Sequence, residues 1–282
     1  MPGWTATSTV IVNAMRSLGF GYKSWNAISK AVMELLCIQF VDDTDLIQSG
    51  HDNNSSGPTI VAEMQEVLDN WDGLLRATGG ALEHSKSYWY LLDYHRRGGK
   101  WCYKPPSAVP GDVSLYNDTT HQKEIIPRLP VTTAKKALGI FTRPDGIMHQ
   151  QRKYLRGKAS DWSDAMRTNH IRKDDAWYCL NTTIMKVVEY PLVATTLTRR
   201  DCGTIMAPTG LHSVDVQKNL PRALVYAPLR YQGMGIADPW ATQLIEHLHV
   251  ILRHCTRPTI NGRLLNSNME NLTLELGSAI PF

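Results

Sequence analysis

Several features that would define a class of protein are absent from this sequence. No run of 18 apolar residues occurs among its 282 residues, so no membrane-spanning helix is expected. The apolar residues near the N-terminus have no basic segment before them, which argues against a secretion signal. The five cysteines are widely spaced and form no CxxC pair, which favours reduced thiols in an intracellular protein. The pattern does not distinguish the nucleus from the cytoplasm.

A large excess of charge is also absent, but the small excess is unevenly distributed. The net charge is +4, and residues 1–147 carry 14 basic and 15 acidic side chains. Residues 148–282 carry 16 basic and 11 acidic side chains, and 10 of these basic side chains lie between 148 and 200. This bias is compatible with binding a polyanion, and equally with an ordinary solvated helical face.

What the sequence does contain is a globular pattern that begins with a helix and a strand pair. Hydrophobic residues make up 43% of the chain, which is enough for a sizeable core. The spacing predicts a helix over 6–18 and a buried strand over 35–41, with residues 45–49 as the hairpin partner of that strand. Residues 59–78 carry the clearest helical stripe, formed by Ile60, Met64, Val67, Leu68, Trp71, Leu74 and Leu75.

Short strands and then helices follow along the chain. The aromatic-rich segments 87–92 and 100–104 predict a strand pair, and "DVSLYN" and "KALGIF" predict further short strands. From residue 148 the apolar spacing becomes helical, and Pro191 is expected to break one of the helices. We therefore expect an α+β fold with a boundary near residue 147.

The stretch "QFVDDTDLIQSG", residues 39–50, places acids between two apolar segments. Asp42 and Asp43 fall at the expected turn, where both carboxylates can approach one ion. On a regular strand, by contrast, adjacent side chains point to opposite faces. Mg²⁺ suits such a site, because it binds one or two carboxylates together with phosphate oxygens. The alternative is an Asx-type turn at the surface.

These motifs occur in the order found in a known family. Phe40 followed by Asp42 and Asp43, between two strands, resembles the catalytic hairpin of reverse transcriptases. "TGGALEHSKS", a glycine turn followed by Lys86, is similar to the next motif of that family. "KALGIF" resembles its Leu-Gly hairpin. "YQGMGI" at 231–236 is similar to a glycine-rich segment of retrotransposons without long terminal repeats. The resemblance spans nearly all of the chain.

The resemblance implies both an architecture and an activity. Residues 1–147 would form a partial right-hand polymerase palm, which is an antiparallel sheet with packed helices and the Asp-Asp hairpin. Residues 148–282 would form a helical thumb and a C-terminal helical extension. The implied activity is RNA-directed DNA polymerisation by two-metal nucleotidyl transfer with Mg²⁺. The implied partners are an RNA template, a DNA primer and deoxynucleoside triphosphates, and no membrane.

Catalytic roles carry over to the residues that match the motifs of the family. Asp42 would bind the metal and Asp43 would be its partner with weaker metal contact. Phe40 would pack near the primer terminus. Lys86 would act near the pyrophosphate leaving group, as charge neutraliser or proton donor. The alternative for Lys86 is a solvated side chain before a strand, and Asp45 is expected to be structural.

Nucleic-acid contacts carry over in the same way. By this resemblance, Leu138 and Gly139 would form the core of the hairpin that holds the primer end, and Gly139 would let the backbone approach the primer. The alternative for Gly139 is an ordinary turn glycine. Four basic side chains would face template–primer phosphates or be simply solvated: Arg152, Lys153, Arg156 and Lys158.

The chain departs from the family upstream of the acids. The family has another aspartate on the strand beside the Asp-Asp hairpin. Residues 1–41 contain a single acid, Glu34, which lies just before the strand predicted over 35–41 and not on a neighbouring strand. The fingers and the usual Gln-Gly element are not visible either. We therefore expect a truncated chain that is inactive as a polymerase by itself. The alternatives are a non-catalytic nucleic-acid-binding remnant of a retrotransposon and a poorly folded relic.

Overall fold

The computed structural model of the chain describes residues 2–40, 43–50, 55–169, 171–207 and 220–278. These residues form helices and short antiparallel strand pairs, which confirms the expected α+β class. The chain divides into two compact units. Unit 1 comprises Met1–Thr133 and His254–Phe282, and unit 2 comprises Ala134–Arg253. No helix in the described part of the chain is long and apolar enough to cross a membrane.

This division differs from the expected boundary near residue 147. The hairpin of β9 (Lys135–Ala137) and β10 (Ile140–Thr142) belongs to unit 2, because it packs on α3 (His149–Thr168). At the other end, α9 (Ile260–Glu275) packs on β2 (Val32–Leu35) of unit 1. The residues from 254 onward therefore join the N-terminal part of the chain, whereas the sequence pattern grouped them with the preceding helices.

Glu270 provides the polar contact that holds α9 on unit 1. Its carboxylate accepts the backbone N–H groups of Ile28 and Ser29 at 2.7 and 3.0 Å, and the amide of Asn26 at 3.2 Å. These donors lie in the turn after β1 (Tyr22–Trp25), where the backbone groups have no ladder partner to bond. One carboxylate thus satisfies several turn donors at once.

The described strands of unit 1 form antiparallel hairpins. Besides β1 with β2, the pairs are β3 (Cys37–Phe40) with β4 (Asp43–Leu46), β5 (Tyr94–Arg97) with β6 (Lys100–Tyr103), and β7 (Val113–Asn117) with β8 (Gln122–Ile126). The described strands build two-stranded sheets only, whereas the resemblance implies a wider antiparallel sheet.

The helices expected over 6–18 and 59–78 are confirmed as α1 (Pro2–Ser17) and α2 (Gly57–Ala77). Ser56 caps α2, because its hydroxyl accepts the N–H of Thr59 at 3.3 Å, and Pro58 occupies the first turn. The predicted stripe faces inward. Val67, Leu68, Trp71 and Leu75 are buried, and Ile60, Met64 and Leu74 are partly buried.

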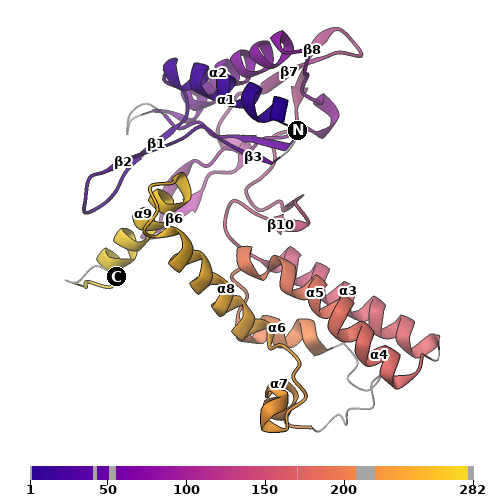
Figure 1. Cartoon of the computed structure of the whole chain (residues 1–282). Helices are drawn as coiled ribbons and strands as arrows, with labels where there is room; N and C mark the ends of the chain where they lie inside the picture. The colour runs from indigo at the N-terminus through magenta and orange to yellow at the C-terminus, as the bar shows by residue number, and fades with distance from the viewer. Residues whose placement is uncertain (1, 41–42, 51–54, 170, 208–219, 279–282) are drawn as a thin grey trace. The chain divides into compact units, whose positions relative to one another are not determined.

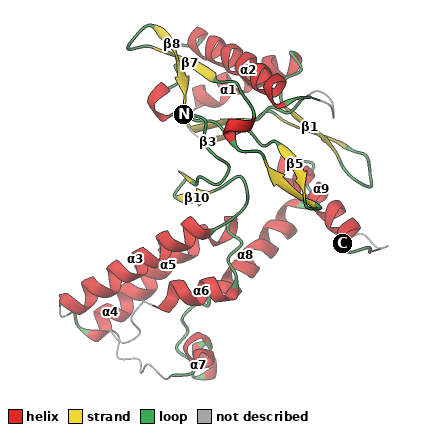
Figure 2. Ribbon diagram, turned by 180° about the vertical axis from the view of Figure 1, so that it is seen from behind, coloured by secondary structure: helices red, strands yellow, loops and turns green. Residues whose placement is uncertain are grey.

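Helix α2 lies between two hydrophobic clusters. Figure 1 shows α1 beside α2, and the cluster that joins them contains Ile11, Met15, Leu36, Val67, Trp71 and Leu75. Figure 2 shows β7 and β8 beside the same helix, where the second cluster contains Val61, Leu68, Trp89, Leu91, Val109, Val113, Leu115 and Ile126. Leu46 of β4 packs against both clusters, so the acid-bearing hairpin is anchored to the core of unit 1.

The strand predicted over 87–92 is wrong. The strand before β6 is β5, seven residues further on, and Gly98 and Gly99 form the turn between them with φ of +56° and +79°. Residues 87–92 contain a single bridge, between Trp89 and Arg128. The partner segment carries Pro127 and Pro130, which have no N–H to donate to a ladder. Trp89 and Leu91 therefore alternate with less buried residues because their side chains enter the core, and not because this segment pairs as a strand.

Unit 2 is mainly helical, as expected from residue 148 onward. After α3 come α4 (Lys173–Cys179), a π-helical turn (Leu180–Ile184), α5 (Met185–Glu189), a 3-10 turn η4 (Tyr190–Ala194), α6 (Arg199–Met206), α7 (Arg222–Tyr226) and α8 (Pro239–His254). Pro191 lies in η4, so the predicted break is confirmed. Figure 2 shows α3 beside α5, and Leu155 of α3 packs with Val188 and Leu192 in one core cluster.

A buried glutamine ties α8 to the loop before α6. The Gln243 Oε1 atom accepts the N–H of Leu197 at 3.0 Å and the hydroxyl of Thr195 at 3.1 Å, and its Nε2 donates to the Leu197 carbonyl at 3.0 Å. Both ends of this amide are satisfied, as is usual for a buried polar side chain.

Candidate catalytic hairpin and nucleic-acid interface

The β3–β4 hairpin has an exposed outer face that mixes acidic and apolar side chains, and an inner face from which Cys37 and Leu46 pack on the core. The register pairs Phe40 with Asp43 and Ile38 with Asp45. Directly paired residues and residues two apart share one face of a hairpin, so these four side chains lie together. All four are exposed, whereas Leu46 and Cys37 alternate with them and pack inward. An antiparallel hairpin is present, but its second strand begins at Asp43, so Asp43 lies in β4 and not in the turn where the sequence pattern placed it.

Two carboxylates share the outer face. Partial burial raises the pKa of Asp45, and the neighbouring Asp43 carboxylate raises it further. The pKa of the Tyr88 hydroxyl is raised by burial and then by Asp45 and Asp43. The charges of Asp43, Asp45 and Tyr88 are therefore electrostatically coupled, and an anion at one position disfavours an anion at the next.

Sequence reasoning assigned Asp45 a structural role and did not single out Tyr88. The i, i+2 spacing of Asp43 and Asp45 on one strand predicts that both lie on one face, so that pattern could have identified Asp45. Nothing in the sequence links Tyr88 to the hairpin, because the proximity arises from the tertiary fold. The ring of Tyr90 packs edge-on against the ring of Tyr88, with 5.8 Å between the ring centroids.

Of the two predicted metal ligands, the structure describes Asp43 alone. Asp42 lies outside the described residues. Among the residues that are described, no three acidic, histidine or cysteine side chains gather into a metal-binding group. Glu34, the single acid upstream, is on β2 and forms a salt bridge of 3.5 Å with Lys23 of β1. Asp43 and Asp45 supply carboxylate oxygens, which are the ligands that Mg²⁺ prefers.

Lys86 lies in unit 1 at the end of a short 3-10 helix, η1 (His84–Lys86), and is exposed. Glu83 caps this helix, because its carboxylate accepts the N–H and the hydroxyl of Ser85 at 3.1 and 2.6 Å. Within the described part of the chain, Lys86 forms no salt bridge with Asp43 or Asp45. The expected role of Lys86 near a leaving group therefore remains a prediction.

In unit 2, Leu138 and Gly139 form the tight turn of the β9–β10 hairpin. Their φ angles are +49° and +85°, the left-handed region required at both central positions of a type I′ turn. The hydroxyl of Tyr190 donates to the Leu138 carbonyl at 2.9 Å. A Cβ on Gly139 would lie 3.4 Å from the Tyr190 ring. The predicted Leu-Gly hairpin is thus present, and its turn is held against η4.

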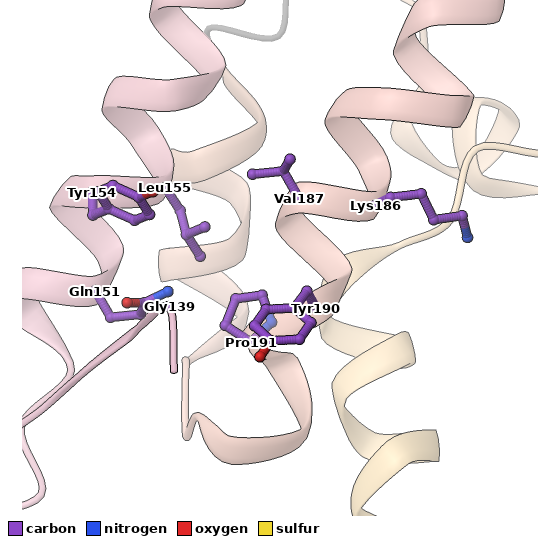
Figure 3. Close-up of a pocket in the computed structure, with 8 residues that line it drawn as sticks. All are labelled: Gly139, Gln151, Tyr154, Leu155, Lys186, Val187, Tyr190 and Pro191. Carbon is purple, nitrogen blue, oxygen red and sulfur yellow. The ribbon is translucent and has the colours of Figure 1, made fainter. Parts of the chain in front are cut away.

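A pocket of about 320 Å³ lies beneath this turn (Figure 3). It is lined by Gly139, Gln151, Tyr154, Leu155, Lys186, Val187, Tyr190 and Pro191. Gln151 is fully buried, and its Oε1 atom accepts the N–H of Phe141 at 2.8 Å. Its Nε2 atom is buried without a hydrogen-bond partner. Figure 3 shows Gln151 beside Gly139, with Tyr190 and Pro191 on the other side of the pocket.

The four basic residues predicted on α3 have different surroundings. The Arg152 guanidinium is ion-paired with Asp201 of α6 and also contacts His149 at 2.9 Å. It therefore joins α3 to the N-terminus of α6. Lys153 and Arg156 are exposed and three residues apart, so they share one face of the helix. Neither forms a salt bridge within the described residues, and both remain the better candidates for phosphate contact.

Lys158 lies on a different side of α3, near the pocket. Its ammonium is 5.9 Å from the centre of the Tyr154 ring, and that of Lys136 on β9 is 4.6 Å from the same ring. Lys136 also lies 3.4 Å from the Tyr154 hydroxyl. Sequence reasoning missed Lys136, because its place beside α3 follows from how the β9–β10 hairpin packs. Two cations thus lie near the ring of Tyr154, which is one of the residues that line the pocket.

Comparisons of the chain with models of known protein families, with curated proteins and with solved structures gave no match.

Proposed function

We propose that this chain is a palm-and-thumb portion of an RNA-directed DNA polymerase of the kind encoded by retrotransposons without long terminal repeats. The observation that carries the proposal is the β3–β4 hairpin. Phe40 and Asp43 form a cross-strand pair on its exposed face, and the opposite face is anchored by Leu46 against α2. This arrangement supports a role in which the acids meet metal and the aromatic ring meets the primer terminus.

Mg²⁺ is the ion that the donor set favours. Asp43 and Asp45 present oxygen ligands on one face, and the raised pKa of Asp45 reflects in part the repulsion from Asp43 that a cation would relieve. Asp42 and Asp43 would hold the ion, with Asp45 near them. When bound, Mg²⁺ supplies positive charge that neutralises phosphate oxygens during nucleotidyl transfer.

The second unit would bind the RNA–DNA duplex. Lys153 and Arg156 form an exposed basic pair on α3, and the Leu138–Gly139 turn accepts a hydrogen bond from the Tyr190 hydroxyl in addition to the pairing of its own strands. Exposed cations and a fixed backbone turn are both suited to contact a phosphate backbone. Such contacts position the nucleic acid without reading its sequence.

Duplex binding tests this proposal directly. We expect the purified chain to bind a labelled RNA template–DNA primer in low salt, measured by fluorescence anisotropy. The double variant Lys153→Gln/Arg156→Gln should bind about 10-fold more weakly, and its salt dependence should fall by about two phosphate contacts. Arg167→Gln is the matched control, because Arg167 lies on the same helix but is paired with Asp164. Equal binding by all three proteins would overturn the duplex-binding role.

A non-catalytic nucleic-acid-binding protein is the second candidate, and it is favoured by the exposed Lys153–Arg156 pair, which needs no metal to contact phosphate. It predicts duplex binding that survives Asp42→Ala and Asp43→Ala, with no divalent-cation site at the hairpin. Mg²⁺-dependent primer extension that disappears in Asp42→Ala would instead establish the polymerase and correct the expectation that the chain is inactive by itself. No duplex binding even in low salt would exclude both candidates.

A further inference from the structure

The buried amide of Gln151 has one satisfied end and one unsatisfied end. Its Oε1 atom must face Phe141, because only an oxygen can accept the backbone N–H that lies 2.8 Å away. The Nε2 donor is therefore fixed on the other side, where it is buried without a partner. The comparison with Gln243 is instructive, because that buried amide is bonded at both ends. Leaving such a donor unpaired is costly, so an acceptor is expected to meet it.

The pocket at Gln151 has the size and lining of a site for one flat ring. Its volume of about 320 Å³ admits a single base or a similar small ring. Leu155, Val187 and Pro191 provide apolar surface, and the rings of Tyr154 and Tyr190 border it (Figure 3). The Lys186 ammonium does not serve the pocket, because it is paired with Glu189 at 2.7 Å. The unsatisfied polar group at the pocket is therefore the Gln151 donor.

Two cations near the Tyr154 ring, outside the lining of the pocket, add a preference for an anion. The ammonium groups of Lys136 and Lys158 lie 4.6 and 5.9 Å from the centre of the Tyr154 ring. A ligand whose ring enters the pocket and whose charge stays outside would place that charge near these two cations. A nucleotide has this chemistry, since a carbonyl-bearing base can accept from Nε2, its ring can pack on tyrosine, and its phosphate is anionic.

We infer that this pocket binds a single unpaired nucleobase that carries a carbonyl group, with the attached phosphate at Lys136 and Lys158. The inference rests on the proposed function in one respect, namely that the base belongs to a nucleic-acid strand held by unit 2. The base carbonyl accepts a hydrogen bond from Gln151 Nε2. The site is distinct from the β3–β4 hairpin and from the Lys153–Arg156 pair.

The direct test follows the side-chain amide of Gln151 by NMR while uridine 5′-monophosphate is added to the full chain. We expect its NH₂ resonances to shift and saturate with this nucleotide, and not with ribose 5-phosphate, which lacks the base. Uridine without phosphate should bind more weakly, and Lys136→Gln should abolish that difference. Unmoved Gln151 resonances at saturating nucleotide would overturn the inference.

Two variants separate binding from folding. Gln151→Glu keeps an acceptor for the Phe141 N–H but replaces the Nε2 donor with an acceptor, and we expect it to bind the nucleotide about 10-fold or more weakly. Val187→Phe should fill the pocket without touching Gln151 and should also abolish binding. The Phe141 amide shift reports whether the hairpin stays folded. Unchanged nucleotide affinity in either folded variant would contradict the assignment.

A second arm identifies the source of the base. A short single-stranded oligouridylate should bind at least 10-fold more tightly than the mononucleotide and shift the same Gln151 resonances. Equal affinities would exclude a strand as the source. Duplex binding that depends on Lys153 and Arg156 should persist in Gln151→Glu. Failure of the pocket experiment with intact duplex binding would therefore overturn this inference alone and leave the proposed function standing.

Discussion

The two hairpins that contain the Asp-Asp and Leu-Gly motifs are stabilised in different ways. The β3–β4 hairpin is held by its apolar inner face, since Leu36, Cys37 and Leu46 pack against the cluster around Trp71. The β9–β10 hairpin has three-residue strands and makes two polar contacts with the helices: the Tyr190 hydroxyl donates to the Leu138 carbonyl, and the side-chain Oε1 of Gln151 accepts the N–H of Phe141. One hairpin therefore depends on core packing and the other on specific hydrogen bonds.

This difference bears on function. A hairpin fixed through its inner face leaves its outer face, with Phe40, Asp43 and Asp45, available for a ligand. A hairpin fixed through its turn presents backbone at a defined position, which suits contact with a nucleic-acid backbone or a base. Core substitutions should therefore disturb the first hairpin, and polar substitutions should disturb the second.

The largest expected effect is on the β3–β4 hairpin. Trp71→Ala removes a side chain that is 1% exposed and should cost unit 1 about 3–5 kcal/mol in the free energy of unfolding. Urea denaturation followed by hydrogen exchange of the β3–β4 amides measures this. Trp101→Ala is the control, because Trp101 is 72% exposed and its loss should change stability by less than about 0.5 kcal/mol. Equal effects of the two variants would contradict the packing described for α2.

The second effect is on the β9–β10 hairpin. Gln151→Ala leaves the Phe141 N–H without its acceptor and should destabilise the hairpin by about 1–3 kcal/mol. Hydrogen exchange at Phe141 should accelerate, whereas exchange in β3–β4 should not change. Acceleration in both hairpins alike would show that they do not differ in the way proposed.

A smaller effect is expected at the turn itself. Tyr190→Phe removes the hydrogen bond to the Leu138 carbonyl but keeps the ring against Gly139, so the loss should be about 0.5–1.5 kcal/mol. Gly139→Ala introduces a Cβ at a φ of +85° and should cost about 1 kcal/mol through backbone strain. Thermal unfolding of unit 2 measures the loss of stability in each variant. A larger loss of stability for Tyr190→Phe than for Gln151→Ala would contradict the expected order.

The smallest effect concerns a third hairpin, β1–β2, where stability is expected to change only at acidic pH. Hydrogen bonds from Ser29, together with those from Ile28 and Asn26, lower the pKa of Glu270 from 4.5 to about 2. The contribution of Glu270 to stability is therefore full above pH 4.5 and is lost as the pH falls toward 2. The amide shifts of Ile28 and Ser29 should titrate near pH 2. Titration near 4.5 would show that α9 does not dock through Glu270.

Much of the local structure was predictable because it has a local cause. The stripe of α2 and its Ser56 cap, the Leu138–Gly139 turn and the break at Pro191 each follow from residues near one another in sequence. Two differences from the expected fold have tertiary causes. Trp89 and Leu91 alternate because they enter the core, not because they pair in a strand. Residues 254–282 leave the helical part because Glu270 meets donors more than 240 positions away.

The residues of the candidate sites show the same difference between local and tertiary causes. Phe40 and Asp43 are paired by the register of one hairpin; the sequence predicted the hairpin but placed Asp43 in its turn. Tyr88, Lys136 and the unsatisfied amide of Gln151 could not be recognised, because each acquires its role from a neighbour that is distant in sequence. The ion pair of Arg152 with Asp201 likewise could not be read from spacing, so four basic residues on α3 looked equivalent.

The measurement that tests the central claim most directly is paramagnetic broadening by Mn²⁺, used in place of Mg²⁺. Substoichiometric Mn²⁺ should broaden the amide resonances of Phe40, Asp43 and Asp45 before those of other residues, and Asp43→Asn should remove this preference. Asp69→Asn is the control, because Asp69 is an exposed carboxylate of unit 1 that is paired with Lys123. Absence of preferential broadening at the β3–β4 hairpin, or preference that persists in Asp43→Asn, would contradict the assignment of this hairpin as a catalytic metal site.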